Sequence, residues 1–294
     1  MLSWGLAWIN AKVLSYYLDS FSLIFWRFLI ASISLFFVAK ALKLSLKVDI
    51  KTLLLSFLAA LLMLLYNYFF FQGTKFGNAG FGGVLVTTLN PILTFFAIAI
   101  LTSKNLGKKE YFALFLGALG SFIMLKIWES GTNIFFENGV QYFLLAAFTW
   151  VFITLLSSIN KQVSTIVFSF YIYLGVIILD YLFFLSEIPS LKGFDSIFWI
   201  NLLAISFFAV TFATTIYFLA TIKLGSKKAS AYIFLVPFSA AFFAWIFLDE
   251  KLEITTIIGG VIVLLAIYIL QDYNWHKRFL KNIKTFLKGK TNEI

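Results

Sequence analysis

The sequence predicts an all-α integral membrane protein with ten transmembrane helices, arranged as two inverted repeats of five helices each. Three observations lead to this prediction: the composition suits a lipid environment, the apolar residues fall into ten long runs, and the second half of the chain resembles the first. Of the 294 residues, 62% are apolar and 12% are charged, whereas a soluble domain has about half and a quarter. The bilayer is therefore the solvent for most of this chain.

Each apolar run is long enough for about one helical crossing, since a hydrocarbon core of roughly 30 Å takes about 20 residues. Helices are expected because lipid-exposed backbone must satisfy its own hydrogen bonds, and the runs are too continuously apolar for alternating barrel strands. In chain order the runs lie near residues 2–18, 21–39, 52–73, 79–101, 110–127, 138–159, 164–186, 198–222, 229–248 and 254–271.

Basic residues are distributed unevenly between the loops of the two sides. With the N-terminus placed inside, seventeen of the 23 fall on the cytoplasmic side: Lys40, Lys43, Lys47, Lys51, Lys104, Lys108, Lys109, Lys161, Lys223, Lys227, Lys228 and the six that follow Tyr273. The other side holds only Lys75, Lys126, Lys192 and Lys251. Because cytoplasmic loops carry the excess of Lys and Arg, we expect a multi-pass protein of the cytoplasmic (inner) membrane with both termini in the cytoplasm.

An internal repeat divides the chain into two halves. Lys75-Phe76-Gly77 matches Lys223-Leu224-Gly225 at an offset of 148, Pro91 matches Pro237 at 146, and Trp4 matches Trp150 at 146. Each half holds five spans, an odd number, so the second half enters the membrane the opposite way up. We expect one repeat over residues 1–130, a second over 136–273, and a basic tail over 274–294, either an amphipathic helix on the anionic leaflet or a solvated anchor.

The chain also resembles the drug/metabolite transporter superfamily, specifically its EamA-type ten-helix carriers. The residues that carry the resemblance are Trp4-Gly5, Asn10, Lys12, Phe25 to Ala31, Ala229 to Pro237, Phe247 to Leu252 and Gly259-Gly260. It covers the chain from Trp4 to about Gln271, but the family's acidic turn after the fourth span is replaced by Thr102-Ser103-Lys104-Asn105. The resemblance implies export or exchange of small metabolites such as amino acids or drugs.

Other functional classes fit the sequence less well. A membrane-embedded enzyme needs a nucleophile, an acid–base pair or metal ligands at one depth, and the chain has no Cys and a single His, His276. A channel usually has polar rings that are contributed by the symmetry of an oligomer. A single chain with internal pseudo-symmetry argues against that class. We therefore expect a carrier, not an enzyme, with no cofactor, no metal and no nucleic-acid partner. It works with a small-molecule substrate and the lipid bilayer, as a monomer or a homodimer.

Three charged side chains fall within predicted spans: Lys12, Arg27 and Asp180. A charge near the bilayer centre costs roughly 3 kcal/mol or more, so such residues usually face the bundle interior or an aqueous cavity. Lys12, beside Asn10, and Arg27 are expected either to meet a carboxylate of the solute or to serve the structure by pairing or by reaching the headgroups. Asp180 is a candidate for proton coupling or, as we favour, a structural partner of Arg27. With only this carboxylate available, uniport or exchange is favoured over proton coupling.

Neutral polar and aromatic side chains are the better candidates for contacting a solute, since they bond it without the desolvation cost of a charge. The alternative for each is an interhelical hydrogen bond, worth about 0.6 kcal/mol. The candidates are Tyr66, Asn67 and Gln72 in the third span, Thr87, Thr88 and Asn90 in the fourth, Trp150 in the sixth, Thr211, Thr214, Thr215 and Tyr217 in the eighth, and Tyr232 in the ninth.

Two further features concern the backbone. Pro91 and Pro237 occupy matching places in the two halves, and each removes one helical hydrogen bond. Matched helix breaks point to the binding site of a carrier with inverted repeats. Gly77, Gly80, Gly82 and Gly83 are expected to let the third and fourth helices approach closely.

Overall fold

The structure is a computed structural model and describes residues 1–77, 79–103, 105–124, 126–130, 139–160, 163–247 and 254–270. Every regular element within these ranges is a helix, and they contain no strand. Some positions of the sequence prediction lie outside the described residues: Lys104, Lys161, Lys251, the Asp249-Glu250 turn and the tail over 274–294.

The first half of the chain forms five long helices and one short one. They are α1 (Leu2–Leu14), α2 (Ser20–Ala41), α3 (Ile50–Phe76), α4 (Ala79–Thr102), α5 (Lys108–Met124) and α6 (Ile127–Ser130). Carboxylate caps begin two of them: Asp19 accepts a hydrogen bond from the Phe21 amide at 3.0 Å, and Asp49 accepts one from the Thr52 amide at 3.1 Å. Hydrogen bonds from Thr52 lower the pKa of Asp49 below its usual value.

The second half forms five spans, two of which are composite. They are α7 (Val140–Ser157), α8 (Thr165–Phe183), the run α9 (Ser196–Ala204), η2 (Ile205–Thr214) and α10 (Thr215–Leu224), the run α11 (Ser226–Ala231), η3 (Tyr232–Phe234) and α12 (Leu235–Phe247), and α13 (Ile254–Leu270). The segment η2 is a π-helix and η3 a single 3-10 turn. Both irregular segments fall inside apolar runs that the sequence predicts as single helices.

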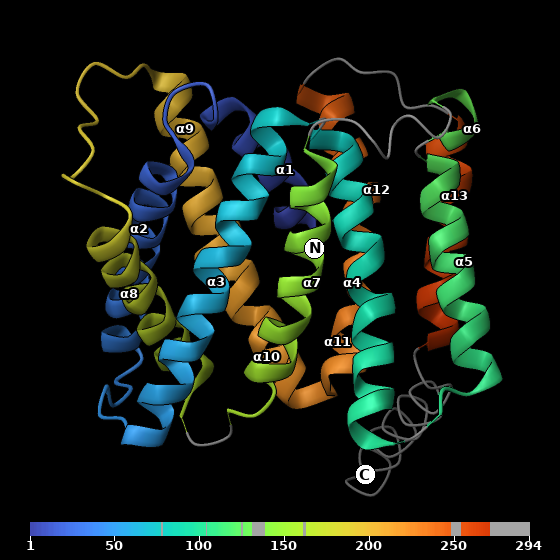
Figure 1. Ribbon diagram of the computed structural model, residues 1–294, viewed down its shortest axis with the longest axis horizontal. Helices are drawn as coiled ribbons and strands as arrows, with labels where there is room; N and C mark the ends of the chain where they lie inside the picture. Colours follow the sequence, from blue (N-terminus) through green and yellow to red (C-terminus); the bar gives the residue numbers. More distant parts are fainter. Residues whose placement is uncertain are drawn as a thin grey trace, which may run out of the picture.

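Within the described residues, the ten predicted crossings are confirmed by ten helical spans in the predicted order. Six helical segments in the described ranges are long and apolar enough by themselves to cross a bilayer. The first span is shorter than predicted, since α1 ends at Leu14 and not near residue 18. At 1.5 Å per residue its 13 residues reach only about 20 Å, and Figure 1 marks the N-terminus about half-way between the two ends of the bundle.

The packing of the helices repeats between the two halves. Helix α1 packs against α12 as α7 packs against α4, and α1 packs against α9 and η2 as α7 packs against α3. Likewise α2 packs against η2 as α8 packs against α3, while the equivalent helices pair with each other, α2 with α8 and α5 with α13. Figure 1 shows these last two pairs at opposite edges of the bundle. This arrangement is that of two pseudo-symmetric five-helix repeats.

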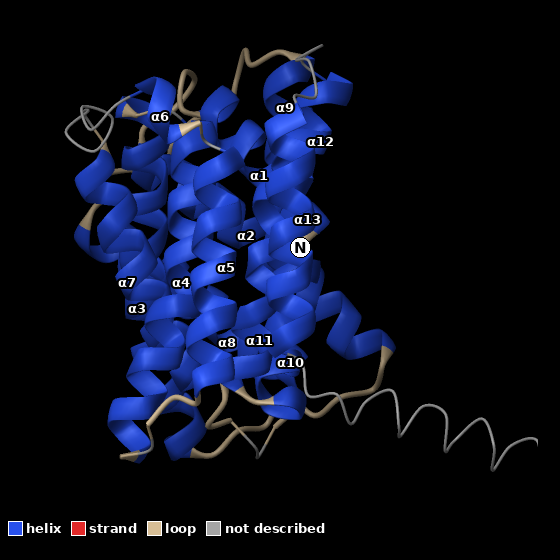
Figure 2. Ribbon diagram, turned by 90° about the vertical axis from the view of Figure 1, so that its right-hand side faces the viewer, coloured by secondary structure: helices blue, strands red, loops and turns tan. Residues whose placement is uncertain are grey.

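The two halves cross the membrane in opposite senses because each contains an odd number of spans. The connecting segments gather at the two ends of the bundle (Figure 2). The predicted inverted relation between the repeats therefore agrees with both the span count and the reciprocal packing.

The glycines of α4 serve contacts other than the predicted one with α3. A Cβ on Gly82 would lie 2.2 Å from Cζ of Phe143 in α7, and a Cβ on Gly83 would lie 3.2 Å from the Trp8 ring in α1. For Gly82 and Gly83 the expectation that they bring α3 and α4 together is wrong, because they make room for aromatic rings of other helices. Gly83 thereby brings Trp8 close to α4.

Candidate functional site

A small cavity lies between the two halves, about half-way along the helices. Trp150 in its wall is ten residues after the start of α7 and seven before its end. The cavity volume is about 40 Å³, room for roughly three water molecules. Its wall consists of Trp4, Ala7, Trp8, Arg27, Phe28, Met63, Tyr66, Asn67, Phe70, Val86, Thr87 and Asn90 from the first half, and Trp150, Val210, Thr214 and Ile233 from the second.

The fold brings several of the predicted site residues to this one cavity. Seven of them line it: Arg27, Tyr66, Asn67, Thr87, Asn90, Trp150 and Thr214. They come from α2, α3, α4, α7 and η2, so no short stretch of sequence could have grouped them. The other predicted residues lie outside the cavity wall, for reasons that differ from residue to residue.

Aromatic rings of both halves meet at the cavity. The rings of Trp4 and Trp150 are in T-shaped contact at 5.2 Å between centroids. Tyr66 packs on Trp150 at 4.6 Å, and Tyr217 packs on Trp4 at 5.1 Å. Trp4 and Trp150 are equivalent positions of the repeat, so their mutual contact lies where the pseudo-symmetry axis passes. Tyr217 stands behind this wall, with its hydroxyl 2.8 Å from that of Thr154.

The π-helix η2 supports the aromatic cluster through its backbone. The carbonyl oxygen of Ala209 accepts hydrogen bonds from Trp4 Nε1 at 3.2 Å and from Thr214 Oγ1 at 2.9 Å. The wider π turn is frequent at functional sites. Here it holds one of the two central tryptophans in place, and it presents Thr214 and Val210 to the cavity.

Arg27 is the charged residue among the described side chains that line the cavity. It is only 6% exposed, and its Nη1 donates a hydrogen bond of 2.7 Å to Asn67 Oδ1. The guanidinium lies 5.7 Å from the ring centroids of Phe70 and Phe71 and 5.9 Å from that of Phe28, within the range of cation–π attraction. Its Nε has no hydrogen-bond partner within the described part of the chain.

The two amide side chains at the cavity differ in what they leave available. Asn67 donates from Nδ2 to the Met63 carbonyl oxygen at 2.7 Å and accepts from Arg27, so it is held at both ends. Asn90 is buried, and its Oδ1 has no partner among the described residues. Thr87 donates its hydroxyl to the carbonyl oxygen of Gly83 in its own helix. Asn90 therefore leaves an acceptor available at the cavity, as Trp150 leaves its indole Nε1 donor.

The two prolines behave differently, and neither lines the cavity. In the ninth span, the 3-10 turn η3 ends three residues before Pro237, where the missing hydrogen bond was expected to disturb the helix. Helix α4 continues through Pro91 from Ala79 to Thr102. The prediction of matched breaks is thus wrong for the first half, since a proline removes a single hydrogen bond and the turns around it remain helical.

Three further candidates lie away from the cavity. Lys12 donates from Nζ to the carbonyl oxygens of Thr74 at 2.8 Å and Gly77 at 3.3 Å, at the C-terminal end of α3. A cation there complements the negative end of the helix dipole, which favours the structural interpretation of Lys12. Asn10 is buried on α1 outside the cavity wall, and Tyr232 packs against a separate apolar cluster whose buried residues come mainly from α4, α5, α11, η3 and α13.

Asp180 does not pair with Arg27, contrary to the favoured prediction. It is completely buried in α8, and neither carboxylate oxygen has a hydrogen-bond partner within the described residues. The charged group with an electrostatic effect on the Asp180 carboxyl group is another carboxylate, Asp19, at the start of α2. The error arises because hydropathy places both residues in the outer part of their spans but gives no rotation about the helix axis.

Most of the apolar wall was not predicted as part of a site. Trp4 was noted as a marker of the repeat and of the family resemblance, Phe28 only within the stretch from Phe25 to Ala31, and Trp8 and Phe70 not at all, although all four line the cavity. A usable signal existed for Trp4, because its repeat partner Trp150 was itself a candidate. No comparable signal distinguishes Phe28 or Phe70 from the other 36 phenylalanines of the chain.

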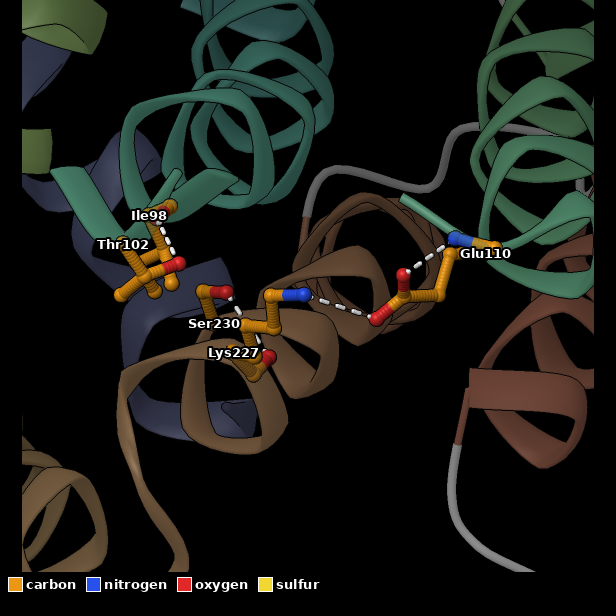
Figure 3. Close-up of polar contacts among 6 residues, drawn as sticks. Ile98, Thr102, Glu110, Lys227 and Ser230 are labelled. Atoms are coloured by element: carbon orange, nitrogen blue, oxygen red, sulfur yellow. Dashed lines mark hydrogen bonds and ion pairs between the residues drawn. The ribbon is translucent and has the colours of Figure 1, made fainter. Parts of the chain in front are cut away.

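Polar contacts join the two halves at both ends of the bundle. At one end, Lys227 of α11 forms an ion pair of 2.8 Å with Glu110 of α5 (Figure 3), and the other oxygen of Glu110 accepts the Gly107 amide at 2.9 Å. At the other end, the Tyr17 hydroxyl lies 3.0 Å from both carboxylate oxygens of Asp195, the cap of α9. The cavity lies between these two contacts.

Comparison with known proteins relates this architecture to membrane carriers. The sequence model of the EamA-like transporter family matches residues 1–126 and 137–271. An "uncharacterized transporter" of Archaeoglobus fulgidus is 28% identical over 276 residues, covering 92% of this chain and 93% of the relative. The "uncharacterized transporter YoaV" of Bacillus subtilis is 25% identical over 277 residues, covering 91% and 92%.

A solved structure shares the fold. A protein described only as "crystal structure of protein" superposes with a TM-score of 0.73, at 17% sequence identity, over 92% of this chain and 94% of its own. Within the described residues, no three His, Cys, Asp or Glu side chains lie close enough together to hold a metal ion.

Proposed function

Because this chain belongs to the EamA-like transporter family of the drug/metabolite transporter superfamily, we propose that it is a secondary carrier for a small metabolite such as an amino acid or a drug. The proposed mechanism is alternating access, in the sense of export or exchange. The two five-helix repeats rock about the cavity between them and open it to one side of the membrane at a time.

The observation that carries this proposal is the shared cavity itself. Side chains of both repeats form its wall, and the equivalent residues Trp4 and Trp150 touch there. Rotation of one repeat against the other would therefore change the wall directly. At about 40 Å³ the cavity is too small for a metabolite, so a solute enters only when the repeats separate on one side.

The contacts at the two ends of the bundle support the same mechanism. The Lys227–Glu110 pair and the Tyr17–Asp195 pair each join one repeat to the other, and both are formed in this conformation. Access from either side requires the pair on that side to separate. In the proposed cycle, this conformation is the closed state between the inward-open and outward-open states.

We assign the end that carries Lys227 to the cytoplasm. Described basic residues of the predicted cytoplasmic loops, Lys40, Lys43 and Lys228 among them, belong to the loops and helix ends of that side, and the positive-inside rule then gives the orientation. This proposal includes the cytoplasmic (inner) membrane as the location, both termini in the cytoplasm, and action as a monomer or a homodimer.

The proposed repeat boundaries remain 1–130 and 136–273, followed by the basic tail over 274–294. The two stretches matched by the family model, 1–126 and 137–271, support a division into two related halves. In this proposal the chain has no catalytic step and needs no cofactor, because rotation of the repeats about a bound solute suffices for carriage.

Transport by purified protein in proteoliposomes tests the proposal. A labelled panel of amino acids, organic acids, amines and nucleosides is offered to wild type, Trp150→Ala and Phe148→Ala. Trp150 lines the cavity, whereas Phe148 lies on the same helix and is 56% exposed toward lipid. We expect at least one class to move, with initial rates reduced about tenfold in Trp150→Ala, since stacking and shape are both lost, and changed less than twofold in Phe148→Ala.

The outcomes separate the parts of the proposal. If no class of solute moves with correctly inserted protein, the carrier function is wrong. If solutes move but the two variants behave alike, the cavity is not the transport site. A rate that follows an imposed pH gradient would indicate proton coupling in place of the uniport or exchange favoured by the sequence.

A further inference from the structure

We propose that the solute held in this cavity is an organic monoanion, with its carboxylate on Arg27 and its flat or apolar body among the tryptophan rings. The inference rests on the proposed function, because it takes the cavity as the transport site. It goes further by naming the charge and shape of the solute.

The described lining of the cavity carries a positive charge and no negative one. Arg27 is 6% exposed, far from bulk water, and a guanidinium stays protonated in proteins. None of the described residues that line the cavity is Asp or Glu, and neither carboxylate oxygen of Asp180 in α8 accepts a hydrogen bond from Arg27 or any other described residue. A buried cation is stable only when paired or well bonded, so the missing counter-charge has to come from the solute.

The guanidinium group of Arg27 is held in place by neutral neighbours. Asn67 uses one donor, on Nη1, and is itself fixed by its bond to the Met63 carbonyl oxygen. The rings of Phe28, Phe70 and Phe71 hold the cation by cation–π contacts. The Nε donor remains without a partner in the described part of the chain, and carboxylates bind guanidinium groups along such an edge. Asn67 is thus a positioning residue for Arg27.

The rest of the cavity wall is largely aromatic and apolar. Trp4, Trp8 and Trp150 supply flat apolar surface on the wall, which suits an aromatic or branched apolar body. Asn90 adds one unpartnered acceptor, Oδ1. The indole Nε1 of Trp150 likewise has no partner among the described residues, so the cavity offers one cation, one unpartnered acceptor, one unpartnered indole donor and aromatic faces.

The two repeats differ in charge at the position of Arg27. At the offset of 146 that relates Trp4 to Trp150, Arg27 corresponds to Tyr173, which is buried and donates its hydroxyl to the Val210 carbonyl oxygen at 2.9 Å. The second repeat thus has a neutral residue where the first has a cation. One charged contact fits one carboxylate, so a monoanion is favoured over a dicarboxylate, and the lack of a lining carboxylate disfavours amines.

The test uses four probes that share one ring: 3-phenylpropionate, its amide, phenylalanine and phenethylamine. Binding to the full-length protein in lipid nanodiscs is measured at pH 7.5 by equilibrium dialysis, and uptake is measured in proteoliposomes together with a wider panel of solutes. We expect 3-phenylpropionate to bind at least tenfold more tightly than the amide and phenethylamine, with phenylalanine weaker than the acid.

Three variants assign this preference to the guanidinium. Arg27→Gln should reduce the preference for the acid over the amide at least tenfold, and Arg27→Lys should retain part of it, since lysine keeps the charge without the planar fork. Lys40→Gln, which removes a positive charge on the exposed end of α2, should leave the preference unchanged.

Tighter binding of phenethylamine or of the amide by wild type would overturn the proposal, as would an unchanged preference in Arg27→Gln. If Arg27→Gln does not fold, the wild-type order of the four probes and Arg27→Lys still decide the matter. Movement of only cationic or neutral solutes overturns the anion assignment and leaves the carrier function standing. Movement of no solute at all counts against the carrier function itself.

Discussion

At the scale of single residues, the three charged side chains predicted within the spans lie in separate environments. Lys12 is bonded to the carbonyl oxygens that end α3, Arg27 lies at the cavity beside Asn67, and Asp180 is buried at the α8 end near Asp19. A charge inside a membrane helix suggests function by default. The position of Arg27 in the cavity wall agrees with that interpretation, whereas the contacts of Lys12 with the end of α3 favour a structural role.

The lack of an ion pair at Asp180 leads to a prediction about stability. Asp180→Asn should change the free energy of unfolding by less than about 1 kcal/mol, because the amide has nearly the same shape and no salt bridge is lost. Removing one member of a true buried pair would cost about 3–5 kcal/mol. Thermal unfolding of the purified variant in detergent measures the difference. A loss of several kcal/mol would mean that Asp180 has a cationic partner after all.

At the scale of elements, the apolar runs correspond to spans, but the inner structure of those spans was not predictable. Residues 198–222 read as one helix, yet the structure inserts the π-helix η2 between α9 and α10. Hydropathy reports only that a stretch lies in lipid. The change of helical pitch depends on side chains from α1 and α8, since Trp4 and Tyr173 bond the Ala209 and Val210 carbonyl oxygens.

Close packing of α4 against α7 yields a second prediction. Gly82→Ala should destabilise the protein by about 1–3 kcal/mol, the usual effect of overpacking, because the added Cβ would lie 2.2 Å from the fully buried ring of Phe143. Thermal unfolding measures the loss. Gly107→Ala is the matched control, since the nearest atom to its Cβ is 4.0 Å away. If the clash is the cause, Phe143→Leu in the Gly82→Ala background should restore part of the stability.

At the scale of the whole molecule, different polar groups join the two repeats at the two ends of the bundle. The ion pair of Lys227 and Glu110 joins them at one end, and Lys227 also lies 5.2 Å from the ring centroid of Phe95. The contact at the opposite end is a neutral hydroxyl bonded to the carboxylate of Asp195. Opening therefore requires different interactions to break on the two sides.

Reversing one charge of the ion pair should favour opening at that end. In Lys227→Glu two carboxylates would face each other, and we expect a cysteine introduced at Val86 in the cavity wall to react severalfold faster with a water-soluble thiol reagent. The natural chain has no cysteine, so the background is clean. The double variant Glu110→Lys with Lys227→Glu restores opposite charges and should return the slow rate. Equal rates in all three proteins would exclude the pair as a closing contact.

The same cysteine-free background tests the orientation. Ser45 lies exposed in the loop between α2 and α3, and Ser190 lies exposed in the loop between α8 and α9. In intact cells a membrane-impermeant maleimide should label Ser190→Cys, and it should label Ser45→Cys only after permeabilisation. The reverse pattern would invert the orientation.

What the sequence by itself determined is the class of the protein, the number and order of its spans, and the repeat. These properties depend on the local free energy of transferring each stretch of chain into lipid, and on residue identities compared at a fixed offset. Both can be read directly from the order of residues in the sequence. The positions of Pro91 and Pro237 were also visible, but only the second disturbs its span.

Only the tertiary structure decided which side chains meet. It brought Arg27 to Asn67 and away from Asp180, and it placed Trp4 against Trp150 at the cavity. The physical reason is that hydropathy gives the depth of a residue but not its direction around the helix, because apolar faces pointing to lipid and to protein look alike in composition. That direction is set by packing between helices far apart in the sequence, and it separates a solute-binding residue from a structural one.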